Sequence, residues 1–187
     1  HVHLRDWSQR DKETLEHGCA VAQSCGVDEL FDMPNTHPTL TDRASILARL
    51  ALAQRSCPDV RYHIWAGLTY DEQQVRLIAR VVEDLYPHVI GLKLFAGHST
   101  GTMGLIEEEA QLRVYQLLSE CGYEKVVAIH CEKEALLRNE MEDPDDWSTH
   151  SLARPVASEV ASVQDQLRLS DQAGFKGHLH ICHLSSL

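Results

Sequence analysis

The chain has 187 residues, and its 17 basic and 28 acidic side chains give a formal net charge of −11. Its length fits one domain or a piece of a larger one, and a 43% share of apolar residues excludes a disordered chain. The negative charge argues against nucleic acid or an anionic membrane surface as partners, and no apolar run approaches the roughly 20 residues that cross a bilayer. We therefore expect a soluble, cytoplasmic protein.

Strands and helices are expected to alternate along the chain. Runs rich in β-forming residues predict strands over 28–33, 60–67, 89–95, 126–131 and 178–184. Helical spacing predicts helices over 42–56, from Asp71 to before Pro87, over 106–121, after 131 and from near Pro155. The expected buried faces are Ile46, Leu47, Leu50 and Ala53 in the first helix and Val75, Ile78 and Val82 in the second. Asp71 and Gln74 have the spacing of a capping box.

The regular spacing of the strands indicates an α/β fold with a parallel sheet and outer helices. A doubly wound sheet would usually carry a G-x-G-x-x-G loop, which this sequence lacks. We therefore favour a (β/α)8 barrel of the TIM type, with residues 1–187 as one partial barrel domain of about six βα units. Because the chain opens at His1 without an initiator Met, we expect a sequence truncated at both ends. The open sheet edges should be covered by further sequence or by a partner, which includes a second copy of the chain.

The six cysteines are scattered and form no C-x-x-C pair. A chain of this length does not need disulfide bonds to stabilise its fold, so we expect reduced and mostly buried thiols.

Twelve histidines make this residue type unusually frequent. His1 and His3 lie two residues apart, so in a strand both imidazoles would point to one face and could bind one metal ion. The alternative is a pair of ordinary polar histidines, because His178 and His180 repeat the same spacing.

Lys93 lies inside the apolar run Ile90-Gly91-Leu92-Lys93-Leu94-Phe95. A buried ammonium is costly, so such a lysine either extends its end to the surface or has a lowered pKa. A neutral amine near a metal can add carbon dioxide and become a carbamate that bridges two cations. Without other ligands in view, the sequence favours a Lys93 side chain whose end extends to the surface.

His130 and His183 each end a β-rich run, where a single histidine is usually structural. Together with His1, His3 and Lys93, however, they would form a set of nitrogen ligands for two metal ions at one end of a barrel.

Two further residues are candidates for binding a carboxylate. Arg5 shares a face with His3, and Asn35 follows the strand over 28–33. The alternatives are a surface ion pair of Arg5 with Asp6 and an ordinary turn at Asn35.

Five strings, HVHLRD (1–6), MPNTHP (33–38), GLKLFAG (91–97), AIHCE (128–132) and HICHLSS (180–186), resemble those of dihydroorotases in the same order. These enzymes belong to the amidohydrolase superfamily of metal-dependent barrels. The resemblance implies two zinc ions, the more buried one held by His1 and His3 and the second by His130 and His183. It also implies a carboxylated Lys93 as the bridge.

By the same resemblance, Arg5 and Asn35 grip the substrate carboxylate, a combination that hydantoinases and allantoinases lack. Thr100 would match a loop that contacts substrate. The family also uses an aspartate after a late strand as metal ligand and proton shuttle, and no aspartate follows His183, so the catalytic acid–base group stays unassigned.

The implied reaction is the reversible hydrolysis of dihydroorotate to N-carbamoyl-aspartate in pyrimidine biosynthesis. Two alternatives stay open: a hydantoinase-like or allantoinase-like cyclic amidohydrolase, and a non-catalytic scaffold for a partner enzyme. The apparently intact set of five metal ligands counts against the scaffold.

Overall fold

The computed structural model describes residues 1–98 and 103–186 and contains one parallel sheet. Its five strands are hydrogen-bonded in sequence order: β1 (Glu29–Asp32), β2 (Arg61–Gly67), β3 (Val89–Ala96), β4 (Val126–Cys131) and β5 (His178–Ile181). The α-helices are α1 (Leu15–Ser24), α2 (Arg43–Ser56), α3 (Glu72–Leu85), α4 (Glu108–Glu120), α5 (His150–Ala153) and α6 (Val156–Gln172). The 3-10 turns are η1 (Trp7–Gln9), η2 (Glu134–Leu136), η3 (Asn139–Met141) and η4 (Trp147–Thr149).

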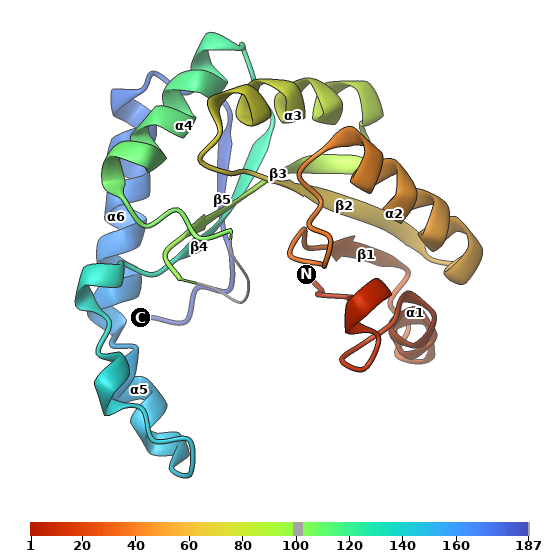
Figure 1. Ribbon diagram of the computed structural model, residues 1–187, viewed down its shortest axis with the longest axis horizontal. Helices are drawn as coiled ribbons and strands as arrows, with labels where there is room; N and C mark the ends of the chain where they lie inside the picture. Colours follow the sequence, from red (N-terminus) through yellow and green to blue (C-terminus); the bar gives the residue numbers. More distant parts are fainter. Residues whose placement is uncertain (99–102, 187) are drawn as a thin grey trace.

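The strands form a curved sheet, with the long helices along its outer side and both termini toward its inner side (Figure 1). The expected α/β class and parallel order are confirmed. The expected count of about six strand units is one too high, because residues 1–4 form a single bridge, Val2 to Asp32, instead of a strand. Within residues 1–98 and 103–186, β5 pairs only with β4, so this edge of the sheet is open as expected.

The two faces of the sheet bury different sets of side chains, as the two-residue period of a strand requires. The face toward the helices carries the main core, including Ile64, Leu92, Leu94, Val127 and Ile129. The inner face carries a smaller cluster of Met33, Trp65, Ala128 and Cys182. The candidate site residues lie at the edge of this inner face.

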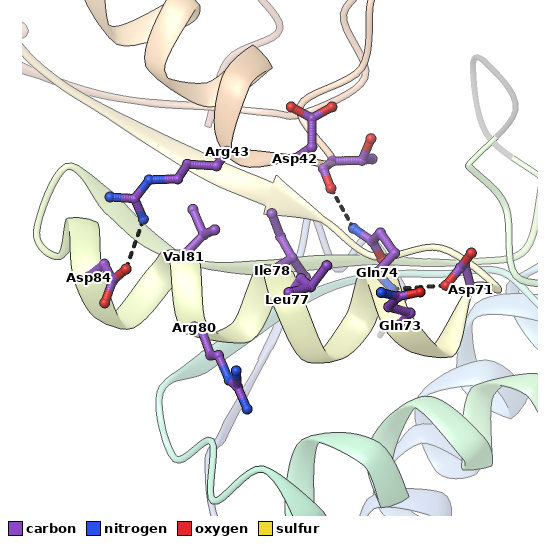
Figure 2. Close-up of a pocket in the computed structure, with 11 residues that line it drawn as sticks. Asp42, Arg43, Asp71, Gln73, Gln74, Leu77, Ile78, Arg80, Val81 and Asp84 are labelled. Atoms are coloured by element: carbon purple, nitrogen blue, oxygen red, sulfur yellow. Dashed lines mark hydrogen bonds and ion pairs between the residues drawn. The ribbon is translucent and has the colours of Figure 1, made fainter.

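Helix α3 agrees with its sequence pattern, and Val75, Ile78 and Val82 are buried. Asp71 accepts a hydrogen bond from the Gln74 N–H at 2.9 Å, as expected for the helix cap. The Gln74 side chain does not complete the capping box. Instead it donates to the Thr41 carbonyl at 2.8 Å (Figure 2) and to the Gly67 carbonyl at 2.8 Å, and thereby ties the start of α3 to the start of α2 and the end of β2.

Helix α2 differs from its predicted pattern in one informative way. Its buried residues are Ile46, Arg49 and Ala53, whereas Leu47 is 44% exposed. Arg49 is fully buried and pairs with the equally buried Asp32 at 2.8 Å. Arg49, which lies outside the predicted buried face, is therefore part of the core, whereas the predicted Leu47 is not.

Other elements depart from expectation for local reasons. Helix α1 was not predicted. Gly18 in its interior lowers helix propensity, and a Cβ there would collide with Leu4. The segment after β4 forms 3-10 turns and the short α5 rather than one helix. Strand β5 ends at Ile181 because His183 adopts a φ of 37°, which cannot continue an extended strand. None of the helices within the described residues is long and apolar enough to cross a membrane.

The cysteine expectation is wrong for one pair. Cys19 of α1 and Cys57, which follows α2, form a disulfide with a sequence separation of 38. Of the four free cysteines, Cys131 and Cys182 are buried, but Cys25 and Cys121 are exposed. The disulfide joins two helices that pack at the start of the sheet.

Replacing Arg49 with Met should lower the free energy of unfolding by about 3–5 kcal/mol, because Asp32 would stay buried without its partner. Arg43→Met on the same helix is the matched control, since the Arg43–Asp84 ion pair is exposed and worth about 1 kcal/mol or less (Figure 2). Urea denaturation measures both. Equal losses for the two variants would contradict the role given to Arg49.

Thiol titration should distinguish the disulfide from six reduced cysteines. When the protein is unfolded without reductant, four cysteines should react with a thiol reagent. After reduction, all six should react. Closing a loop of this length corresponds to about 4 kcal/mol in the chain-entropy model, so reduction should also lower stability. Six reactive thiols before reduction would show that Cys19 and Cys57 are not joined.

Candidate metal and substrate site

Four histidines meet at one edge of the sheet. His1 and His3 lie in the segment beside β1, His130 is the penultimate residue of β4, and His183 follows β5 by two residues. The carboxyl ends of parallel strands share one edge, so these positions converge although they are far apart in sequence. The rings of His1 and His183 have their centroids 5.6 Å apart, which brings the two ends of the chain together.

The histidines form two close pairs. In the first pair, His1 Nε2 and His3 Nε2 are 3.1 Å apart. In the second pair, His130 Nδ1 and His183 Nε2 are 3.2 Å apart. Two nitrogens bound to one tetrahedral zinc ion at its usual bond length would be about 3.3 Å apart. Each pair therefore has the spacing of two ligands of one zinc ion.

One histidine of each pair is held through its other ring nitrogen. His3 Nδ1 lies 2.7 Å from Asn35 Oδ1, and His130 Nε2 lies 2.9 Å from Glu132 Oε2. Burial raises the pKa of Glu132, but hydrogen bonds from His130 and Arg154 outweigh it and lower this pKa below its usual value. Glu132 is therefore a carboxylate acceptor. Metal-binding histidines are commonly oriented by such contacts.

Lys93 lies near both pairs. It is 1% exposed, so the surface-reaching alternative is wrong, and its Nζ donates to Cys182 Sγ at 3.2 Å. Desolvation lowers the pKa of Lys93, which favours the neutral amine that can add carbon dioxide. Burial lowers the pKa values of His3 and His183 as well, and the charge of Lys93 contributes to both shifts.

The histidine pairs alone supply fewer ligands than a zinc ion usually has in a protein. Within residues 1–98 and 103–186, no three His, Cys, Asp or Glu side chains are grouped so that they could hold one metal ion. Burial also raises the pKa of the nearby Cys131 to about 12, so its thiol stays protonated and is a poor ligand. Each pair supplies two imidazole nitrogens, and Lys93 is a further nitrogen donor close enough for its charge to act on a histidine of each pair.

Arg5 and Asn35 lie next to each other beside the first histidine pair. A guanidinium N–H of Arg5 donates to the backbone carbonyl of Asn35, whose side chain contacts His3. The alternative of a surface ion pair between Arg5 and Asp6 is not what the structure shows, because Asp6 binds other groups. Its carboxylate pairs with Arg49 at 3.1 Å and accepts the N–H of Leu15. Thr100 lies outside the described residues.

Two carboxylates around the site were not predicted. Glu132 had a visible signal, since it lies two residues after His130 and thus on the same face of the chain. Glu159 of α6 had none. Its carboxylate accepts the N–H groups of Ser185 and Ser186 at 3.1 and 2.6 Å and so anchors the segment after His183. Burial raises the pKa of Glu159, but these hydrogen bonds outweigh it and lower the pKa.

A cavity of about 320 Å³ opens beside the second histidine pair, lined by His130, Glu132, Arg154, Glu159, His183 and Ser185 among others. The groove between the start of α2 and α3 in Figure 2 is larger, at about 510 Å³, but it contains none of the candidate site residues. The chemistry-bearing side chains therefore belong to the smaller cavity and the strand ends beside it.

No protein-family model matches the chain. Curated relatives called dihydroorotase include one from Methanosarcina mazei, 30% identical over 190 residues, and one from Thermococcus kodakarensis, 28% identical over 187 residues. Both alignments cover the whole of this chain but only 39% and 38% of the relative. The chain thus spans about two fifths of the length of these relatives.

Solved structures share the fold. An L-hydantoinase (dihydropyrimidinase) from Arthrobacter aurescens matches with a TM-score of 0.81 at 21% identity, covering 97% of this chain and 40% of that one. A dihydroorotase from Saccharomyces cerevisiae, solved with 5-fluoroorotic acid, matches with a TM-score of 0.62 at 18% identity, covering 97% and 45%. Five parallel strands that alternate with helices thus correspond to part of these structures. In sequence the chain is therefore similar to dihydroorotases over about two fifths of their length, and in fold it resembles part of the hydantoinase and dihydroorotase structures.

Proposed function

We propose that the protein is a cyclic amide hydrolase of the dihydroorotase type, which opens dihydroorotate to N-carbamoyl-aspartate reversibly in pyrimidine biosynthesis. The observation that carries this proposal is the convergence of two histidine pairs around a buried lysine, with Arg5 and Asn35 beside them. The dihydroorotases among its relatives support the choice of substrate. A cytoplasmic location is part of the same proposal.

His1 and His3 would hold one zinc ion and His130 and His183 the other, with carboxylated Lys93 between them. Bound there, the two ions would lower the pKa of a shared water and polarise the amide carbonyl. Asn35 and Glu132 hold the rings of His3 and His130 in the orientations that this binding requires. The lowered pKa of Lys93 favours carbamate formation.

Arg5 positions the substrate. Its guanidinium can donate two parallel hydrogen bonds to the carboxylate of dihydroorotate, which fixes the ring so that its amide carbonyl faces the metal site. Hydrolysis adds a hydroxyl to the carbonyl carbon and a proton to the ring nitrogen as the bond between them breaks. The group that transfers this proton stays unassigned.

Replacing Arg5 with Ala should lower kcat/KM for dihydroorotate about tenfold to a hundredfold, since a hydrogen bond to a charged group is worth about 1.5–3 kcal/mol. Turnover of a hydantoin ring that carries no carboxylate should change little. Steady-state assays with both substrates measure the difference.

Arg10→Ala is the matched control, because Arg10 is exposed and lies in the same N-terminal segment. Equal dihydroorotate turnover by Arg5→Ala and the parent protein would disprove the carboxylate contact. A parent protein that hydrolyses only the neutral ring would identify a hydantoinase-like enzyme, and one that hydrolyses neither would support a scaffold.

A further inference from the structure

A buried polar cluster connects α2 to the first residues of the chain. Its centre is Arg49, which is fully buried. The guanidinium donates from Nη2 to Asp32 at 2.8 Å and from Nε to the Tyr62 hydroxyl at 3.0 Å. The Tyr62 hydroxyl in turn donates to the same Asp32 oxygen. Burial, reinforced by the charge of Asp32, raises the pKa of Tyr62 well above its usual value, so this hydroxyl stays a donor.

The cluster binds the backbone between two candidate site residues, His3 and Arg5. The Leu4 carbonyl accepts from Arg49 Nη2 at 2.6 Å, and the Leu4 N–H donates to Asp32 Oδ1 at 2.9 Å. Both polar backbone groups of Leu4 are thus fixed by one ion pair. Successive side chains of an extended segment point to opposite sides, so holding Leu4 in the main core on the helix side directs His3 and Arg5 toward the site.

The next two residues give independent support. Asp6 and Trp7 have φ values of 51° and 45°, a left-handed conformation that is unfavourable for residues with a Cβ. Such a conformation persists only where the surroundings impose it. Here the Asp6 carboxylate binds Arg49 at 3.1 Å, and the guanidinium lies 5.2 Å from the centre of the Trp7 ring.

We propose that Arg49, Asp32 and Tyr62 are positioning residues, which set the direction of His3 and Arg5 through the backbone of residues 4–6. This inference rests on the proposed function, because it assigns His3 to the metal and Arg5 to the substrate. A well-packed apolar residue in place of Arg49 could fill the same space but would leave Leu4 and Asp6 without these partners.

The test compares Tyr62→Phe with Tyr115→Phe, because Arg49 and Asp32 variants risk unfolding the protein. Tyr115 is another buried tyrosine, and its hydroxyl donates to the Gln166 side chain at 2.9 Å between α4 and α6. The probe is Co²⁺ alone, titrated into metal-free protein and followed by its visible spectrum. Amide hydrogen exchange of Leu4 is measured on the same samples without metal.

For Tyr62→Phe we expect one of the two Co²⁺ binding steps to weaken about tenfold, the size typical of lost outer-sphere contacts, with the other unchanged. The Leu4 amide should exchange faster. Tyr115→Phe should change neither quantity. If the parent binds Co²⁺ but the two variants behave alike in both measurements, the positioning inference is overturned and the proposed function stands. If the parent binds no Co²⁺, the metal site itself fails and this inference fails with it.

Discussion

The buried ion pair between Arg49 and Asp32 is the contact on which the geometry of the site depends. Desolvating two charges is expensive, and an isolated pair of this kind contributes little net stability. Here the cost is offset by the remaining hydrogen bonds, which go to Tyr62, Asp6 and the backbone of Leu4. The pair therefore joins β1, β2, α2 and the N-terminal segment at one point.

The second histidine pair is held in a comparable way from the other end of the chain. Glu159 binds the backbone of Ser185 and Ser186 just after His183, and Glu132 holds His130. The N-terminal segment with His3 and the segment after β5 with His183 both lack regular strand structure where they reach the site, so carboxylates and a guanidinium bind their backbones there. Lys93, in contrast, is placed by the middle of β3 and needs only the sheet to fix its backbone.

Local sequence patterns could predict the parallel α/β order, the buried face of α3 and the position of His130 near a strand end, because each depends on neighbouring residues. They could not predict that Arg49 takes a core position, since its partner Asp32 lies on another element. The Cys19–Cys57 disulfide and the contact of Glu159 with Ser185 are of the same kind. Contacts between distant segments are set by packing and leave no periodic signal. The roles of the histidines and of Lys93 as metal ligands stay predictions.

The proposed function requires four histidines and a modified lysine to form a two-metal centre. The most direct measurement is zinc content by elemental analysis, combined with the native mass of the purified protein. We expect about two zinc ions per chain. Once the zinc is subtracted, the mass should exceed the sequence mass by one carbon dioxide, and Lys93→Ala should lose this excess. A protein that binds no zinc after supplementation with zinc and bicarbonate would contradict the two-metal centre.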